Sequence, residues 1–173
     1  VMDVAFHDVG GWLSAHRDWD GTVATLAGRW EAVIESGGDV WVKEGGQSDL
    51  TAAVVRQLRS TGPELPVGDR VHVVQHSNWN EEQTTPEALE YVKQTVDYIR
   101  IPDANTFLNI AGGDPEFEAA ARAHPVFGPI WGAAFAYYDP AERLDFSDTG
   151  ELLFLLDFGV MPIDEFRKHY LAN

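Results

Sequence analysis

Residues 70–109, RVHVVQHSNWNEEQTTPEALEYVKQTVDYIRIPDANTFLN, form the stretch that decides the fold. A β-branched run at residues 70–75 predicts a buried strand, and residues 96–101 predict the next strand, which ends before Pro102. Between them, residues 85–87 (Thr-Pro-Glu) are typical of a helix start, with a capping hydroxyl, a proline and an acid near the positive end of the helix dipole. A strand–helix–strand unit of this length places the two strands parallel, joined by a right-handed crossover.

Polar side chains are concentrated where these two strands end. They are His76, Asn78, Trp79 and Asn80 in a loop after the first strand, and Asp103, Asn105 and Asn109 after the second. Because open parallel sheets bind ligands beyond the carboxyl ends of their strands, both loops are predicted to face one binding site. The alternatives are a structural histidine bound to a carbonyl, a tryptophan that covers the edge of the core, and Asx turns after the proline.

A glycine pair precedes another predicted helix. Residues 21–36 have helical periodicity, residues 40–42 form a strand, and apolar residues between Leu50 and Leu58 mark the next helix. The turn before that helix contains Gly45, Gly46 and Gln47, whose backbone N–H groups could bind an anion or a sugar. A tight turn without a ligand explains the same glycines.

After Asn109 the pattern becomes helical. Helix starts or apolar helical runs occur near residues 114–116, 128–138, 148–156 and 162–171. We find no internal domain boundary, so residues 1–173 are predicted to form a single α/β domain. Its expected architecture is a mainly parallel sheet with helices on both faces and a helical C-terminal part.

Composition restricts the classes of partner. The formal net charge is −16 and the chain has no cysteine, which argues against nucleic-acid polymers and anionic membranes and excludes thiolate metal sites and disulfides. We see neither a signal peptide nor an apolar run of the about 18 residues that a membrane span needs. A soluble protein is expected, either cytoplasmic or secreted. Because residues 4–7 read as a strand already under way, we expect upstream sequence, which would make the chain the C-terminal portion of a longer domain.

The first loop contains a second group of potential metal ligands. It comprises His7, Asp8, His16, Asp18 and Asp20. Their spacing matches no ligand pattern, and acids before a helix are usual caps, so a solvated loop is favoured over a metal site.

The order of these features resembles the later part of the nucleoside hydrolase-like superfamily, particularly bacterial branches of uncharacterised or carbohydrate-related proteins. The resemblance covers residues 1–160 by order of elements and is carried by loose motifs. They are VWVKEGGQSDLTAAVVRQL, VHVVQHS, WNEEQTTPEALEYV, YIRIPDAN and FSDTGELLFLL.

The resemblance implies hydrolysis of an N-ribosyl or related glycosidic bond by water that a calcium ion activates. Asn80 matches a ribose-binding asparagine and Asp148 a late aspartate that binds the metal. The glycine turn would line the floor of the cavity, which His76 and Asn78 would face. The substrate would be a small sugar or nucleoside.

Two departures from the family pattern leave the function open. The aspartate cluster of the family's first strand is absent, since Asp3 and Asp8 are poor substitutes, and Ser147 stands where relatives often have a histidine. The general base and most calcium ligands would then come from an upstream segment or from another chain, as in a homo-oligomer. The alternatives are a sugar- or nucleoside-binding module without turnover and a structural domain whose polar edge contacts a partner.

Overall fold

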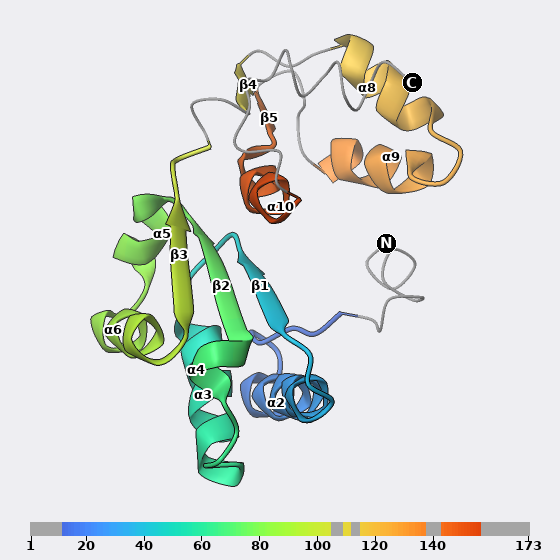
Figure 1. Cartoon of the computed structure of the whole chain (residues 1–173). Helices are drawn as coiled ribbons and strands as arrows, with labels where there is room; N and C mark the ends of the chain where they lie inside the picture. Colours follow the sequence, from blue (N-terminus) through green and yellow to red (C-terminus); the bar gives the residue numbers. More distant parts are fainter. Residues whose placement is uncertain (1–11, 105–108, 112–114, 138–142, 157–173) are drawn as a thin grey trace.

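The computed structural model describes residues 12–104, 109–111, 115–137 and 143–156. Within them, three strands form a parallel sheet in the order β1-β2-β3 (Figure 1). The strands are β1 (Val40–Glu44), β2 (Val71–His76) and β3 (Asp97–Ile101). Val73 pairs with Val42 on one side and with Tyr98 on the other, so the predicted parallel pairing across residues 70–101 is confirmed.

Helices lie before and between the strands. They are α2 (Trp19–Glu35), α3 (Asp49–Thr61), α4 (Val67–Arg70), α5 (Ser77–Gln83) and α6 (Pro86–Thr95). Helices α2, α3 and α6 cover one face of the sheet, whereas α4 leads directly into β2 and α5 follows it directly. Helix α3 packs against both α2 and α6 and buries Val54, Val55 and Leu58 in one cluster with Val71 and Val73 of β2. Burial of these apolar side chains is the main stabilisation of the sheet and its helices.

Among the described residues, the later part of the chain adds an antiparallel pair of short strands and four helical segments. Strands β4 (Asn109–Ala111) and β5 (Arg143–Asp145) pair antiparallel. The helical segments are α8 (Pro115–Ala123), α9 (Gly128–Tyr137), the 3-10 turn η2 (Ser147–Thr149) and α10 (Gly150–Leu155). Helices α8 and α9 pack through Phe117, Trp131 and Phe135.

Helix α10 lies near the carboxyl ends of the strands and contacts all three of them (Figure 1). Side chains alternate along a strand, so Val71 and Val73 of β2 face the α3 layer while Val74 and His76 face the other way. Val74 and Leu153 of α10 are fully buried. Helix α10 therefore brings the late part of the chain to the carboxyl ends of the strands, where the predicted binding site lies.

The sequence prediction of an α/β fold with parallel strands followed by helices is confirmed in these coarse terms, and two details differ. The predicted loop after β2 is helix α5, which follows the strand directly through Ser77 at a φ of 63°. The β4–β5 pair was not predicted, because three-residue strands are too short to show a period. The expected strand at residues 4–7 and helix at residues 162–171 lie outside the described residues.

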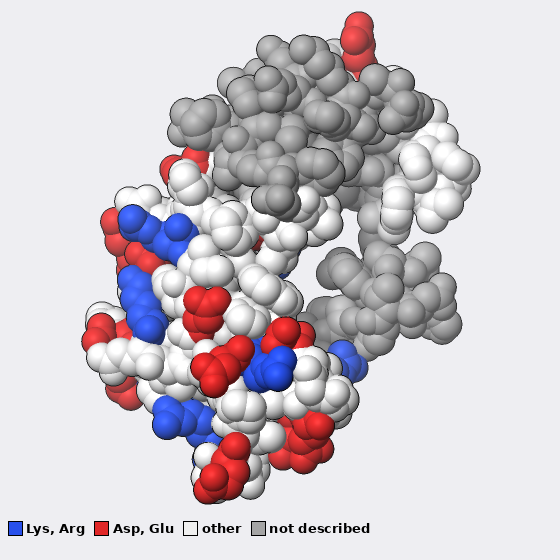
Figure 2. All heavy atoms as spheres, in the orientation of Figure 1, with Lys and Arg blue, Asp and Glu red and all other residues white. Residues whose placement is uncertain are grey.

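Charged side chains of both signs are mixed on the face shown in Figure 2, over the sheet and its helices. In that view the described residues show several separate groups of lysine and arginine, each beside acidic side chains. Among the described residues, Arg70 pairs with Asp39 and Arg56 pairs with Glu87, both at 3.0 Å.

Candidate functional site

The candidate site lies where β2, the segment after β3 and the start of α10 meet. His76 ends β2, Asp103 follows β3, and Asp148 and Glu151 lie in η2 and α10. One ligand atom from each of His76, Asp148 and Glu151 lies within 4.8 Å of the others. Three segments far apart in the sequence thus contribute to one group of titratable side chains.

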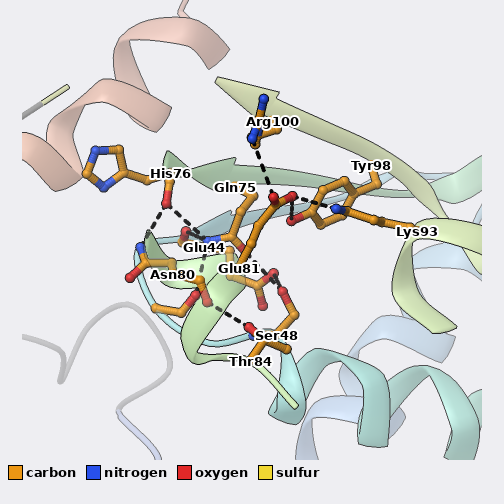
Figure 3. Close-up of polar contacts among 11 residues, drawn as sticks. Glu44, Ser48, Gln75, His76, Asn80, Glu81, Thr84, Lys93, Tyr98 and Arg100 are labelled. Atoms are coloured by element: carbon orange, nitrogen blue, oxygen red, sulfur yellow. Dashed lines mark hydrogen bonds and ion pairs between the residues drawn. The ribbon is translucent and has the colours of Figure 1, made fainter. Parts of the chain in front are cut away.

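His76 is the centre of this group. Its side chain is only 3% exposed, and its ring points away from the interior hydrogen-bond network towards α10 (Figure 3). Nδ1 lies 3.5 Å from Asp148 Oδ1, and Nε2 lies 3.6 Å from Asp103 Oδ1. The backbone N–H of Ala104 donates to Nε2 at 3.1 Å. Because Nε2 accepts this bond, the proton of the neutral ring is on Nδ1 and faces Asp148.

The carboxylates around the ring favour its charged form. The hydrogen bond to Asp148 raises the pKa of His76, burial lowers it, and the charges of Glu151, Asp148 and Asp103 raise it. The Ala104 N–H acts against protonation, since it needs the lone pair of Nε2. The carboxylates therefore favour the protonated ring of His76, whereas the Ala104 N–H favours the neutral ring.

Glu151 is the most unusual side chain of the site. It is completely buried, and neither carboxylate oxygen has a hydrogen-bond partner among the described residues. The ammonium of Lys43 lies 4.0 Å from Oε1, which is too long for a hydrogen bond. Burial raises the pKa of Glu151, and its own backbone N–H and the charge of Lys43 lower it by less. A buried polar group without partners is rare in folded proteins and indicates a function or an unfilled interaction.

Gly45 allows the β1–α3 turn to approach Asp148 closely. A Cβ atom at this position would lie 2.8–3.0 Å from the Asp148 carboxyl group, whereas at Gly46 it would meet nothing within 4 Å. Real Cβ atoms essentially never come that close to another heavy atom. Of the two glycines predicted to line the site, only Gly45 is therefore required to be a glycine by its close approach to a site residue, Asp148.

A buried polar network supports the turn from behind (Figure 3). Gln75 donates from Nε2 to the carbonyl oxygens of Glu44 and Gly46, both at 3.0 Å, which fixes its Oε1 towards Ser48. Ser48 Oγ lies 2.9 Å from that oxygen and 2.7 Å from Glu44 Oε2, and Thr51 donates to Glu44 Oε1.

This geometry favours a protonated Glu44. One serine hydroxyl has one proton and cannot donate to two oxygens, so a protonated Glu44 that donates to Ser48, which then donates to Gln75, satisfies every group. Burial raises the pKa of Glu44, in agreement with this arrangement, although the bonds from Thr51 and Ser48 lower it. Glu44 is an internal structural acid beneath the turn.

Helix α5 is tied to the same network. Asn80 Nδ2 donates to the His76 carbonyl at 2.8 Å, Thr84 Oγ1 donates to the Asn80 carbonyl at 2.8 Å, and the Ser48 N–H donates to Thr84 Oγ1 at 3.1 Å. Glu81 of α5 pairs with Lys93 at 2.8 Å and accepts from Tyr98 at 3.0 Å (Figure 3). These bonds hold both the carbonyl group of His76 and the helix that follows it.

A separate pocket of about 420 Å³ opens beside β1, on the α2–α3 side. It is lined mainly by Leu26, Trp30, Trp41, Val42, Lys43, Glu44, Gly45, Gly46, Gln47, Leu50, Thr51 and Val54. The pocket and the His76 group are different places in the fold, and the glycine turn lies between them. We give the His76 group more weight, because it contains a buried carboxylate without a hydrogen-bond partner among the described residues and comes from three separate segments.

The structure brings some of the predicted site residues together and separates others. His76, Asp103, Asp148 and Gly45 meet, as expected from the ends of parallel strands. Asn80 is buried and bonded to the His76 carbonyl, while Asn78 and Trp79 are exposed on α5 and Gln47 is exposed at the pocket. Asn105 lies outside the described residues, as does the side chain of Asn109.

Sequence reasoning missed Glu151 and Lys43. Glu151 follows Asp148 by three residues, a spacing that places two side chains on one face of a helical turn, and this was the available signal. The acids of the first loop give no comparable group: Asp18 Oδ1 accepts the Gly21 N–H at 2.9 Å as the cap of α2. His7 and Asp8 lie outside the described residues.

The donor set of the site does not fit the expected calcium ion. Calcium takes about six to eight oxygen ligands. The group of described residues offers two carboxylates and an imidazole nitrogen, which is a ligand for transition metals. Glu151, with its two unbonded and buried oxygens, nonetheless has the chemistry of a cation ligand.

Comparison of the chain with models of known protein families, with curated proteins and with solved structures gives no match. The resemblance to nucleoside hydrolases therefore stays a prediction. In the part of the chain that the structure describes, we find no helix with the length and apolar character needed to cross a membrane.

Proposed function

We propose that this chain hydrolyses the glycosidic bond of a small sugar or nucleoside at the carboxyl edge of its parallel sheet, in a nucleoside hydrolase-like fold with helices on both faces. The observation that carries the proposal is the position of His76 between two carboxylates from different segments, Asp103 on Nε2 and Asp148 on Nδ1. The Asp148 side chain is 62% exposed, so it can reach a substrate, while His76 is buried and holds it.

Paired acidic groups suit this reaction because its transition state is positively charged at the sugar carbon. Asp148 would take a proton from water as the hydroxyl adds to the anomeric carbon. The bond to the leaving group breaks at the same time, and the leaving group takes a proton from solvent. The charge of Asp103 favours the oxocarbenium-like state, and His76 is a positioning residue.

Hydrolysis of a panel of nucleosides and nitrophenyl glycosides tests this proposal. We expect turnover of at least one substrate and a loss of about 10²–10⁴-fold in Asp148→Asn, the usual contribution of a positioned acid or base. The matched control is Asp69→Asn, which changes an exposed acid of α4 and should leave turnover unchanged. Equal activity in wild type and Asp148→Asn contradicts the assignment.

A second candidate is a sugar- or nucleoside-binding module without turnover. The observation that favours it is Trp79, whose ring is 60% exposed on α5 next to the exposed Asn78, an arrangement able to stack on a sugar or base and donate to it. Calorimetry with ribose separates the two functions: binding without turnover on any substrate, lost in Trp79→Ala, supports the module.

A further inference from the structure

Among the described residues, negative charge outweighs positive charge at Asp148 and Glu151. These two carboxylates lie beside His76, and their lysine partner is Lys43, whose Nζ is 4.0 Å from Glu151 Oε1. Elsewhere in the fold a comparable carboxylate is fully paired: Glu81 has Lys93, Arg100 and the Tyr98 hydroxyl. The imbalance is therefore a property of this site and not of acidic residues in general.

Protonation of Glu151 does not remove the problem. The ionised form leaves two buried acceptors without donors, and the neutral form has an O–H donor that lacks an acceptor among the described residues. Either form is costly for a side chain that is itself completely buried. A cation bound between Glu151 and its neighbours would give this carboxylate a partner.

We propose that His76, Asp148 and Glu151 bind a divalent transition-metal ion of the Zn²⁺ type. Imidazole nitrogen and carboxylate oxygen are both ligands of such ions, and three protein ligands leave a position for water or substrate. Nδ1 of His76 and Oδ1 of Asp148 are 3.5 Å apart, close to the about 3.4 Å that separates two ligands of a tetrahedral ion with bonds of about 2.1 Å. The Asp148 side chain is 62% exposed, so the site lies within reach of solvent.

Asp103 is suited to the outer shell of this site. A metal on Nδ1 requires the proton on Nε2, and Asp103 Oδ1, now 3.6 Å away, could accept that proton after a shift of a few tenths of an ångström. Metal-bound histidines usually donate their other N–H to such a carboxylate. The change of tautomer costs the hydrogen bond that Ala104 donates to Nε2.

The glycine turn leaves room for the site. A side chain on Gly45 would meet the Asp148 carboxyl group at under 3.0 Å and push it away from His76. Gly46, with open space around it, provides a matched control for the same substitution. This inference concerns the ion alone and does not depend on the identity of the substrate.

Isothermal titration calorimetry of the full chain with Zn²⁺ alone tests the proposal, supported by the visible absorption of bound Co²⁺. We expect one Zn²⁺ per chain and weaker binding of Ca²⁺ and Mg²⁺. Asp103→Asn should lower the affinity by about 10–100-fold, as the loss of an outer-shell partner does. Glu151→Gln and Asp148→Asn should lower it by more than that, because each removes a direct ligand.

The matched control is Glu82→Gln, since Glu82 is an exposed acid of α5 whose loss should leave affinity unchanged. Circular dichroism without metal checks folding of each variant; if Glu151→Gln unfolds, the exposed Asp148 provides the decisive variant. Absence of Zn²⁺ binding in the wild type, affinity unaffected by Asp148→Asn, or tighter Ca²⁺ binding at the same residues overturns the proposal. The titration contains no sugar, so its failure leaves the hydrolase assay to be judged separately.

Discussion

Strand β2 carries a histidine at each end, and the two have opposite surroundings. His72, near the amino end, lies 2.8 Å from Asp97 and 3.8 Å from Asp39, and it stacks on Trp41 with ring centroids 4.2 Å apart. Arg70 pairs with Asp39 at 3.0 Å. His76, four residues later on the same face of the strand, also lies between two carboxylates.

The difference lies in burial and in the available positive charge. The His72 side chain is 16% exposed and its carboxylates have an arginine, so this end is a complete surface ion cluster. The His76 side chain is 3% exposed and is accompanied by the unbonded Glu151. The comparison indicates that a histidine between acids is structural where its carboxylates are paired, and points to ligand binding where a buried carboxylate has no hydrogen-bond partner among the described residues.

The largest effect is expected from removal of the network that supports the His76 end. Gln75→Ala leaves Ser48 and the carbonyl oxygens of Glu44 and Gly46 without their buried partner. We expect a loss of about 3 kcal/mol in the free energy of unfolding, since each such group costs about 1–3 kcal/mol. Urea denaturation measures it, with Gln83→Ala on the exposed end of α5 as the control. Equal stability of the two variants would show that the network contributes little.

A smaller effect is expected from crowding the turn. Gly45→Ala should destabilise the fold by about 1 kcal/mol, because the added Cβ atom displaces only the carboxyl end of the exposed Asp148 side chain, which can turn aside. Gly46→Ala, which meets no neighbour, should leave the free energy of unfolding within about 0.5 kcal/mol of wild type. Thermal denaturation of the pair is the measurement, and a larger loss for Gly46→Ala would contradict the described approach of Gly45 to Asp148.

The amino end should respond weakly. His72→Gln removes a partly exposed ion pair with Asp97 and a stacking contact with Trp41. We expect a loss of about 1 kcal/mol in the free energy of unfolding, because exposed pairs and ring contacts contribute that much at most. The same variant should keep wild-type Zn²⁺ affinity; a lowered affinity would break the distinction between the two ends of the strand.

The smallest effect concerns pH. Burial raises the pKa of Glu44 above its ordinary value of 4.5, so the folded chain binds a proton that the unfolded chain has released. The resulting stability is present below about pH 4.5 and is lost as the pH rises through the raised pKa. Glu44→Gln mimics the protonated form and should flatten this decline in urea titrations at several pH values. If the stability of Glu44→Gln declined with pH as steeply as that of the wild type, a group other than Glu44 would be responsible for the decline.

The sequence predicted the sheet well because its signals are local. Residues 70–75 and 96–101 are β-branched runs, and Thr85-Pro86-Glu87 marks the start of the helix between them, so parallel pairing followed from connection length. Short elements such as β4, β5 and α5 carry too few residues for a period and depend on tertiary contacts.

The sequence allowed the position of the candidate site to be predicted, but not all of the residues that form it. His76 and Asp103 come at the carboxyl ends of two adjacent parallel strands. Their proximity could therefore be predicted from the strand order alone, without knowledge of side-chain positions. Asn80 stands beside His76 in sequence yet turns inward to the His76 carbonyl, because the segment is helical. Glu151 belongs to the site only because α10 packs across the strands, which no local pattern indicates.

The free energy of unfolding with and without Zn²⁺ tests the central claim most directly, namely that the His76 end of β2 binds a cation and the His72 end does not. At a Zn²⁺ concentration about 100 times the dissociation constant, the wild type and His72→Gln should each gain about 2.7 kcal/mol. Glu151→Gln should gain nothing at that concentration. The absence of a gain in the wild type, or an equal gain in Glu151→Gln, would contradict the claim.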